Sequence, residues 1–170
     1  DDYDLNALKC LLAVGSALHT GLKQRIFDAV GPIVIEAYGL TEGPLTIIDG
    51  DECAKLPGSV GKPIFGTDIR IINQDGVEVP AGTDGEIVGR GPHNMPGYYN
   101  NPDATAEATW ISPEGDKWLK TGDLGRLDDN GFLYIVGRLK DMIISGGQNI
   151  YPSDIEAVLI THPDVNDLQL

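Results

Sequence analysis

The chain has 170 residues, 41% of them hydrophobic and 22% charged, a composition that is typical of folded globular proteins and argues against disorder. No run of about 18 apolar residues occurs, which excludes a transmembrane helix. The net charge of -14 excludes nucleic acid as a partner because no basic stripe can neutralise phosphates, whereas a small anionic ligand needs only a few local donors.

Strand and helix patterns alternate in the first third of the chain. Residues 7–14 predict a buried strand, residues 20–30 a helix that Gly31 ends, and residues 32–38 a second buried strand. The apolar residues expected to share one face of the helix are Leu22, Ile26, Phe27 and Val30. A strand, a helix and a strand joined by short links form a βαβ unit, so the two strands should run parallel.

Two glycine-containing segments, 14–18 and 38–43, are predicted at the points where these strands end. The carboxyl ends of parallel strands meet at one edge of a sheet, which is where open α/β folds bind their ligands. The second segment, YGLTEG, offers an aromatic ring, a hydroxyl and a carboxylate. We therefore expect a ligand at this edge.

From about Asp49 the pattern changes to short strands and turns. Residues 68–80 and 126–136 each predict a hairpin, with turns at QDG and NG, and residues 85–91 predict a further strand. A short helix should begin at Pro102, since proline suits the first turn of a helix. We expect this middle part of the chain to form an antiparallel barrel or folded sheet.

Three charged residues, Arg138, Lys140 and Asp141, lie between two apolar stretches. They form either a solvated turn between strands or a joint where two bodies meet around a charged ligand. Beyond them a helix should begin at Pro152, and residues 165–170 predict the beginning of a strand. The apolar residues expected on one face of that helix are Ile155, Val158 and Leu159.

The cysteines and histidines form no metal or disulfide pattern. Cys10 and Cys53 stand alone and the three histidines are scattered, so we expect no metal site built from protein ligands alone. Isolated cysteines are typical of a reducing compartment, and we therefore expect a cytoplasmic protein.

Two groups of residues suit a nucleotide. Thr41 can donate to a phosphate oxygen, Glu42 can hold a magnesium ion that phosphates already bridge, and Tyr38 offers a face to an aromatic base. The alternative is a polar turn that closes a strand. Asp123 is placed where a carboxylate can accept both hydroxyls of a ribose, and Arg138 could reach the same sugar. Their simpler interpretations are a turn residue and a surface ion pair, which contributes little.

Four segments carry a family resemblance through their order and spacing. They are AYGLTEG, GEIVGRGPHNMPGYYNNPDAT, WLKTGDLGRLDDNGFLYIVGRLKDMIISGGQNIYPSDIE and THPDV. From about Ala13 onward the chain resembles the adenylate-forming (AMP-binding) superfamily and looks most like its acyl- and aryl-CoA synthetases. The resemblance implies that a carboxylic acid and ATP, with Mg²⁺, give an acyl-adenylate and pyrophosphate. Coenzyme A would then displace AMP to give a thioester.

The resemblance also implies a role for each residue that matches a family motif. The implied roles are adenine binding for Gly15, Ser16, Ala17 and Tyr38, contact with the α-phosphate for Thr41, magnesium binding for Glu42, and ribose binding for Asp123 and Arg138. Many relatives have glycine at the position of Ser16, so this residue departs slightly from the family motif. Lys140 matches the hinge about which a small C-terminal domain rotates, and Gly146 and Gly147 match a loop beside the pantetheine arm of CoA. The charged segment is thus interpreted as a joint.

The fold implied is α/β plus β, in three parts. The expected parts are the end of an α/β nucleotide-binding subdomain at residues 1–48, a β-barrel subdomain at 49–137, and a hinge with the start of a small α+β domain at 138–170. The sequence shows neither the pyrophosphate loop nor the distal catalytic lysine of the relatives. We therefore expect an internal fragment of an acid–CoA ligase that is inactive in isolation.

Other functions remain open at the level of sequence. One is an adenylation domain that loads a carrier protein, and another is a luciferase-like oxygenase with the same fold. A third, from a different class, is a nucleotide-binding or interaction module without catalysis. The sequence names neither the carboxylic acid nor the oligomeric state.

Overall fold

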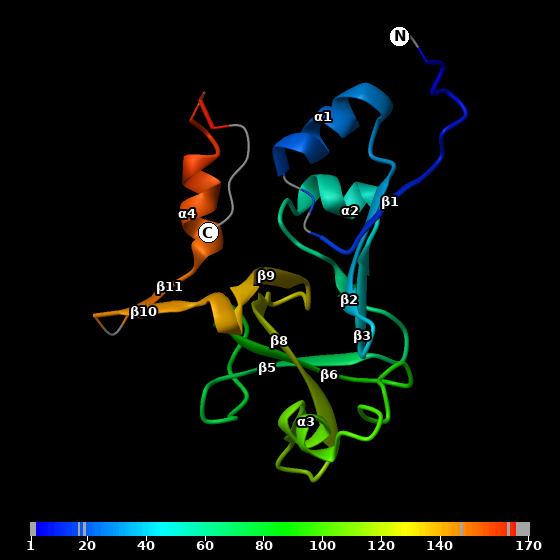
Figure 1. Cartoon of the computed structure of the whole chain (residues 1–170). Helices are drawn as coiled ribbons and strands as arrows, with labels where there is room; N and C mark the ends of the chain where they lie inside the picture. The colour runs from blue at the N-terminus through cyan, green and yellow to red at the C-terminus, as the bar shows by residue number, and fades with distance from the viewer. Residues whose placement is uncertain (1–2, 17, 19, 147, 163, 166–170) are drawn as a thin grey trace.

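Two main sheets organise the chain, of which the computed structural model describes residues 3–16, 18, 20–146, 148–162 and 164–165 (Figure 1). A third, two-stranded sheet lies toward the C-terminal end. Within the described ranges, no helix has the length and apolar character needed to cross a membrane.

The first sheet has four strands in the order β1-β2-β3-β4. They are β1 (Leu11–Val14), β2 (Val34–Leu40), β3 (Gly43–Ile48) and β4 (Lys62–Pro63). Strands β1 and β2 pair in parallel and are connected by helix α1 (Thr20–Val30), so the predicted βαβ unit is confirmed. Strands β3 and β4 pair antiparallel and make the sheet mixed. Helix α1 ends as predicted, with Gly31 at φ 83° and its N–H donating to the Phe27 carbonyl over 2.9 Å.

The inner face of α1 differs from the prediction at one position. Leu22 is 46% exposed, whereas the neighbouring Lys23 is only 3% exposed. Ile26, Phe27 and Val30 are partly buried, as expected from their spacing. The difference arises because Lys23 forms an ion pair with Glu36 of β2, which gives a charged side chain the inward position.

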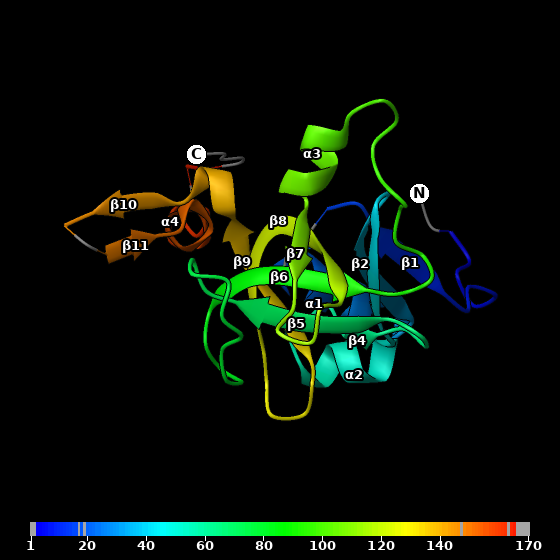
Figure 2. The same cartoon turned by 90° about the horizontal axis from the view of Figure 1, so that it is seen from below.

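The second sheet is antiparallel and curled (Figure 2). Its strands follow the order β5-β6-β8-β7, with β9 paired to β8. They are β5 (Asp68–Ile72), β6 (Gly85–Arg90), β7 (Thr109–Ile111), β8 (Lys117–Leu127) and β9 (Leu133–Arg138). The predicted antiparallel arrangement is confirmed. Its core is a cluster of buried aliphatic side chains from β5, β6, β9 and the segment before β4, namely Val60, Ile69, Ile71, Ile87 and Leu133.

Of the two predicted hairpins, the second forms fully and the first only in part. Strands β8 and β9 pair antiparallel, and the Asp128 N–H donates to the Phe132 carbonyl over 2.9 Å at their turn. In the first hairpin, residues 77–80 run back beside β5 but form only an isolated antiparallel β-bridge with it, between Ile72 and Glu78. β5 instead pairs along its length with β6.

Two short helices flank the sheets. Helix α3 (Pro102–Glu107) begins at the predicted proline, and Asn101 caps it by accepting from the Ala104 N–H. Helix α2 (Gly50–Lys55) is not predicted by the sequence analysis. Asp49 caps it by accepting from the Glu52 N–H over 2.9 Å.

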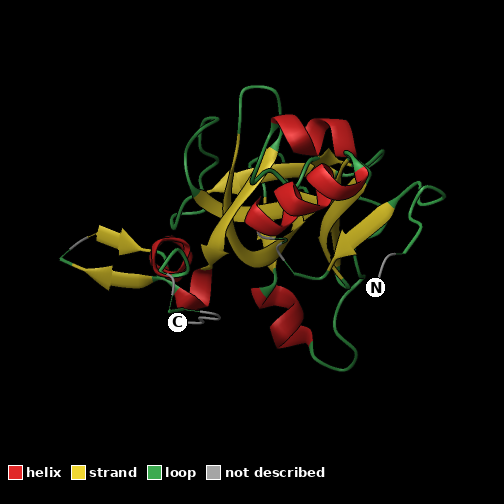
Figure 3. Ribbon diagram, turned by 90° about the horizontal axis from the view of Figure 1, so that it is seen from above, coloured by secondary structure: helices red, strands yellow, loops and turns green. Residues whose placement is uncertain are grey.

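The C-terminal elements extend away from the two main sheets (Figure 3). They are the 3₁₀ turn η1 (Leu139–Asp141), strands β10 (Ile143–Ser145) and β11 (Gln148–Ile150), and helix α4 (Pro152–Leu159). The helix predicted from Pro152 is confirmed, but its apolar residues Ile155, Val158 and Leu159 are exposed. Of the strand predicted at 165–170, Val165 lies outside any strand and the other residues lie outside the described part of the chain.

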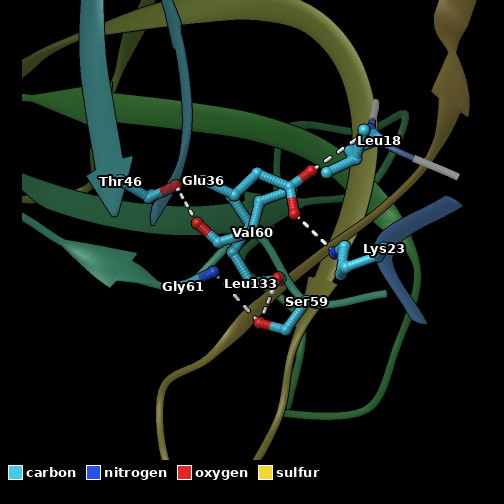
Figure 4. A network of polar contacts seen from close by, with 8 residues as sticks. All are labelled: Leu18, Lys23, Glu36, Thr46, Ser59, Val60, Gly61 and Leu133. Atoms are coloured by element: carbon cyan, nitrogen blue, oxygen red, sulfur yellow. Dashed lines mark hydrogen bonds and ion pairs between the residues drawn. The ribbon is translucent and has the colours of Figure 1, made fainter. Parts of the chain in front are cut away.

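Buried hydroxyls connect the two main sheets (Figure 4). Ser59 is fully buried, and its Oγ donates to the Leu133 carbonyl and accepts from the Gly61 N–H, each over 3.0 Å. Thr46 of β3 donates to the Val60 carbonyl over 2.7 Å. The short segment around Ser59 therefore joins β3 to β9 through side chains as well as through its backbone.

We expect Ser59→Ala to lower the free energy of unfolding by about 1–3 kcal/mol, because the Leu133 carbonyl and the Gly61 N–H lose a buried partner. The measurement is urea unfolding of the full-length protein. Ser145→Ala removes an exposed hydroxyl. This control should change the free energy by less than about 0.5 kcal/mol. Equal effects of the two substitutions would contradict the structural role of Ser59.

Candidate functional site

A cavity of about 530 Å³ lies where the two main sheets meet. Its wall includes the segment that follows β1, most of β2, Asp123 of β8 and the second half of β9. Five of the residues predicted to bind a nucleotide line it together, namely Gly15, Ser16, Tyr38, Asp123 and Arg138. The fold thus brings together residues separated by more than a hundred positions in the sequence.

The Asp123 carboxylate lies at the centre of this group. It accepts a hydrogen bond from the Tyr38 hydroxyl at Oδ2 over 2.7 Å, and one from Arg138 Nε at Oδ1 over 2.9 Å. Asp123 is only 6% exposed. An ionised carboxylate accepts about four hydrogen bonds, so each oxygen keeps a free acceptor position. The pair of oxygens can therefore accept two further donors, such as the two hydroxyls of a ribose.

A bulge in β8 gives Asp123 its position. Opposite β6, Val88 pairs with Lys120 and Glu86 with Leu124, so three residues of β8 (121–123) face a single residue of β6. Gly122, at φ 71°, provides the left-handed conformation that this bulge contains. The Asp123 N–H donates to Thr121 Oγ1 over 3.1 Å. The bulge thereby directs the Asp123 side chain toward β2, where it meets the Tyr38 hydroxyl.

Burial, and then the negative charge of Asp123, raise the pKa of the Tyr38 hydroxyl well above its usual range. The hydroxyl therefore remains a neutral donor at physiological pH. The hydrogen bond and the charge of Asp123 also raise the pKa of Arg138, which keeps its positive charge. Tyr38 and Arg138 thus hold the carboxylate in one orientation.

A buried ion pair that the sequence analysis missed lines the same cavity. Lys23 Nζ lies 2.5 Å from Glu36 Oε2, and both side chains are almost fully buried. Glu36 Oε1 also accepts from the Leu18 N–H over 3.3 Å, so the pair holds the chain that follows Gly15 and Ser16 (Figure 4). The available signal was Glu36 itself, a single charged residue in the apolar segment 32–38.

Thr41 and Glu42 form the turn between β2 and β3 and do not belong to the wall of this cavity. Thr41 is exposed, and Glu42 is partly buried. Glu42 Oε1 accepts from the Tyr98 hydroxyl over 3.1 Å, and this hydrogen bond raises the pKa of Tyr98. No role for Tyr98 is predicted from the sequence.

The residues of this turn fit a magnesium ion that arrives with a nucleotide. Mg²⁺ is usually held by one or two carboxylates together with substrate phosphates and water. Within the described ranges no three His, Cys, Asp or Glu residues are grouped for a metal. Glu42, a partly buried carboxylate whose Oε1 accepts from the Tyr98 hydroxyl, is compatible with this arrangement.

Lys140 and Gly146 are not part of the cavity wall. Lys140 is exposed in η1, two residues past Arg138. Gly146 lies at the turn between β10 and β11 with φ 59°. Ala17 and Gly147 lie outside the described residues.

Comparison with protein families gives one match, to the model described as "AMP-binding enzyme", over residues 1–99. The 2-succinylbenzoate–CoA ligase of Bacillus cereus (strain Q1) is 44% identical over 162 residues, which are 94% of this chain and 32% of that protein. The feruloyl-CoA synthase of an Amycolatopsis species is 41% identical over 164 residues, which are 95% of this chain and 32% of that protein. The chain therefore spans about a third of the length of these relatives.

Solved structures show the same similarity. The o-succinylbenzoate CoA synthetase of Bacillus subtilis, solved with its acyl-adenylate intermediate, has a TM-score of 0.82 and 38% identity, with 94% of this chain and 32% of that chain covered. The same enzyme with ATP and a magnesium ion has a TM-score of 0.80 and 37% identity, with 93% and 32% covered.

Proposed function

The chain belongs to the family of AMP-binding enzymes, and on this premise we propose that it carries the nucleotide-binding part of an ATP-dependent acid–CoA ligase. The observation that supports this most is the Asp123 carboxylate, which lines the cavity and which Tyr38 and Arg138 hold in one orientation. The CoA ligases and synthases among its relatives supply the reaction class.

In the first step, a carboxylate oxygen of the acid attacks the α-phosphorus of ATP, and the bond to pyrophosphate breaks. Asp123 would accept from the ribose hydroxyls, and Arg138 would contact the same sugar. Gly15, Ser16 and Ala17 would line the adenine, with Tyr38 against its other face. These contacts hold the nucleotide in one orientation and so lower the entropic cost of reaching the transition state.

The triphosphate would lie toward the β2–β3 turn, where Thr41 would contact the α-phosphate and Glu42 would hold Mg²⁺. When bound, the ion would neutralise the negative charge that develops on the phosphates. Glu42 has one oxygen available for this purpose, since the other accepts from Tyr98. Thr41 is exposed and can reach a ligand that enters from solvent.

In the second step, the thiol of CoA attacks the acyl carbonyl and AMP leaves. We assign residues 1–48 to the α/β nucleotide-binding subdomain, 49–137 to the β-barrel subdomain and 138–170 to the hinge and the beginning of a C-terminal domain. Lys140 would be the hinge residue, and Gly146 and Gly147 would lie beside the pantetheine arm. The position of η1 directly after Arg138 supports a joint at this point. We place the reaction in the cytoplasm, where thiols such as Cys10 and Cys53 remain reduced.

The test is ATP–pyrophosphate exchange by the full-length protein, measured over a panel of aromatic and aliphatic carboxylic acids. We expect exchange with one class of acid, and a thioester once CoA is added. The 170-residue chain alone is expected to give no exchange. Exchange without a CoA product would favour an adenylation domain that loads a carrier protein. Absence of exchange with every acid would favour a non-catalytic nucleotide-binding module.

A further inference from the structure

The segment 91–101 lies against the β2–β3 turn and contacts Glu42 twice. The Tyr98 hydroxyl donates to Glu42 Oε1 over 3.1 Å, and the Met95 N–H donates to the Glu42 carbonyl over 2.7 Å. One contact thus fixes the carboxylate and the other fixes the backbone that carries it. The two partners of Glu42 come from one short segment more than fifty residues further along the chain.

Close packing holds this segment against the turn. Gly43 has φ 123°, and a Cβ atom at this position would lie 2.4 Å from Asn94 Oδ1. Asn94 is itself held by its side-chain amide, which donates to the Gly89 carbonyl over 2.7 Å. A side chain at position 43 would clash with Asn94, so the β2–β3 turn and the segment 91–101 pack closely at this point.

The other side of Tyr98 is tied to helix α3. The Tyr98 N–H donates to Thr105 Oγ1 over 2.9 Å, and a Cβ atom on Gly97 would lie 2.9 Å from the methyl group of Thr105. The backbone of Tyr98 is therefore held in place, while the residue as a whole is 41% exposed and is not part of the core. Its hydroxyl can be removed without opening a buried cavity.

We propose that Tyr98 is a positioning residue for Glu42: it binds Oε1 and leaves Oε2 directed to a divalent cation carried by the phosphates of a nucleotide. This inference rests on the proposed function, in which Glu42 holds that cation. A carboxylate with one oxygen hydrogen-bonded has fewer orientations available. It therefore loses less conformational entropy when the ion binds. Removal of such supporting hydrogen bonds typically weakens metal affinity by about 10- to 100-fold.

The test compares ATP binding by the full-length Tyr98→Phe variant and by the unsubstituted protein, using isothermal titration calorimetry. One measurement is made in EDTA without Mg²⁺, and a separate series is made at increasing MgCl₂ concentrations. We expect the Mg²⁺ concentration needed for half of the maximal increase in ATP affinity to rise by about 10-fold. The Kd for ATP in EDTA should change by less than about twofold, since nothing in the nucleotide cavity is altered. The matched control is Tyr99→Phe, which removes the hydroxyl of a neighbouring tyrosine that is 93% exposed and should change neither quantity.

Glu42→Gln provides the second comparison. In this background Tyr98→Phe should have no further effect on the Mg²⁺ dependence, because Tyr98 acts through the carboxylate. An equal loss in EDTA and in Mg²⁺, an unchanged Mg²⁺ dependence, or an additive effect in the double variant would each overturn the inference. If the unsubstituted protein binds ATP without any response to Mg²⁺, the role of Glu42 and that of Tyr98 fail together. If it binds no ATP, the proposed function fails as well.

Discussion

Asp123→Ala in the full-length protein is expected to weaken ATP binding by about 100-fold or more, because two charge-assisted hydrogen bonds to the ribose are lost. The substitution also removes the partner of Tyr38 and of Arg138, which currently donate to the two oxygens of this carboxylate. Arg138 then lacks the anion that fixes its orientation. Both effects weaken ATP binding. The loss of affinity for Asp123→Ala should therefore exceed the loss caused by removing the Tyr38 hydroxyl or the Arg138 guanidinium alone.

The measurement is the Kd for ATP by isothermal titration calorimetry. Asp129→Ala serves as the matched control, because Asp129 is an exposed aspartate in the β8–β9 turn. This control should change the Kd by less than about twofold. Asp123→Asn keeps the size of the side chain and one acceptor oxygen, and should therefore give a smaller loss than alanine. An affinity of Asp123→Ala within a few-fold of the unsubstituted protein would contradict ribose binding at this position.

Lys23→Met is expected to lower the free energy of unfolding by about 3–5 kcal/mol, the usual cost of removing one partner of a buried ion pair. Lys23 and Glu36 have side chains exposed by only 4% and 6%, so the remaining carboxylate would be buried without its cation. Methionine has a similar length and keeps the packing of α1 on the sheet. The loss therefore reports the unpaired charge rather than a cavity.

The double variant Lys23→Met/Glu36→Gln separates charge from packing. Glutamine is uncharged and still accepts from the Leu18 N–H, so the double variant should recover about 2 kcal/mol of the loss in urea unfolding. Lys55→Met, which removes an exposed lysine, is the control and should have an effect below about 0.5 kcal/mol. If the double variant were as unstable as Lys23→Met, the loss would be due to packing and not to the charge of Glu36.

Much of the fold could be predicted because its signals are local. The strand, helix and strand of residues 11–40 follow from apolar spacing and from Gly31, and the β8–β9 hairpin follows from its turn. The grouping of Asp123 with Arg138 was also accessible to sequence reasoning. The two residues are directly opposite each other in the register of β8 and β9.

Contacts between distant segments could not be predicted. Lys23 and Glu36 each interrupt an apolar pattern, and nothing in either segment shows that the two charges meet. The Tyr98–Glu42 contact joins residues 56 positions apart and depends on the path of the segment 91–101. The bulge at 121–123 is visible only once β6 and β8 are paired, although Gly122 is its necessary residue.

The most direct test of nucleotide binding at this cavity is a crystal structure of the full-length protein with AMP. We expect the ribose hydroxyls within about 2.5–3.0 Å of the Asp123 carboxylate oxygens. The adenine should lie between the Gly15–Ser16 segment and the Tyr38 ring. AMP bound at another surface, or in this cavity with its ribose out of hydrogen-bonding reach of Asp123, would contradict the assignment.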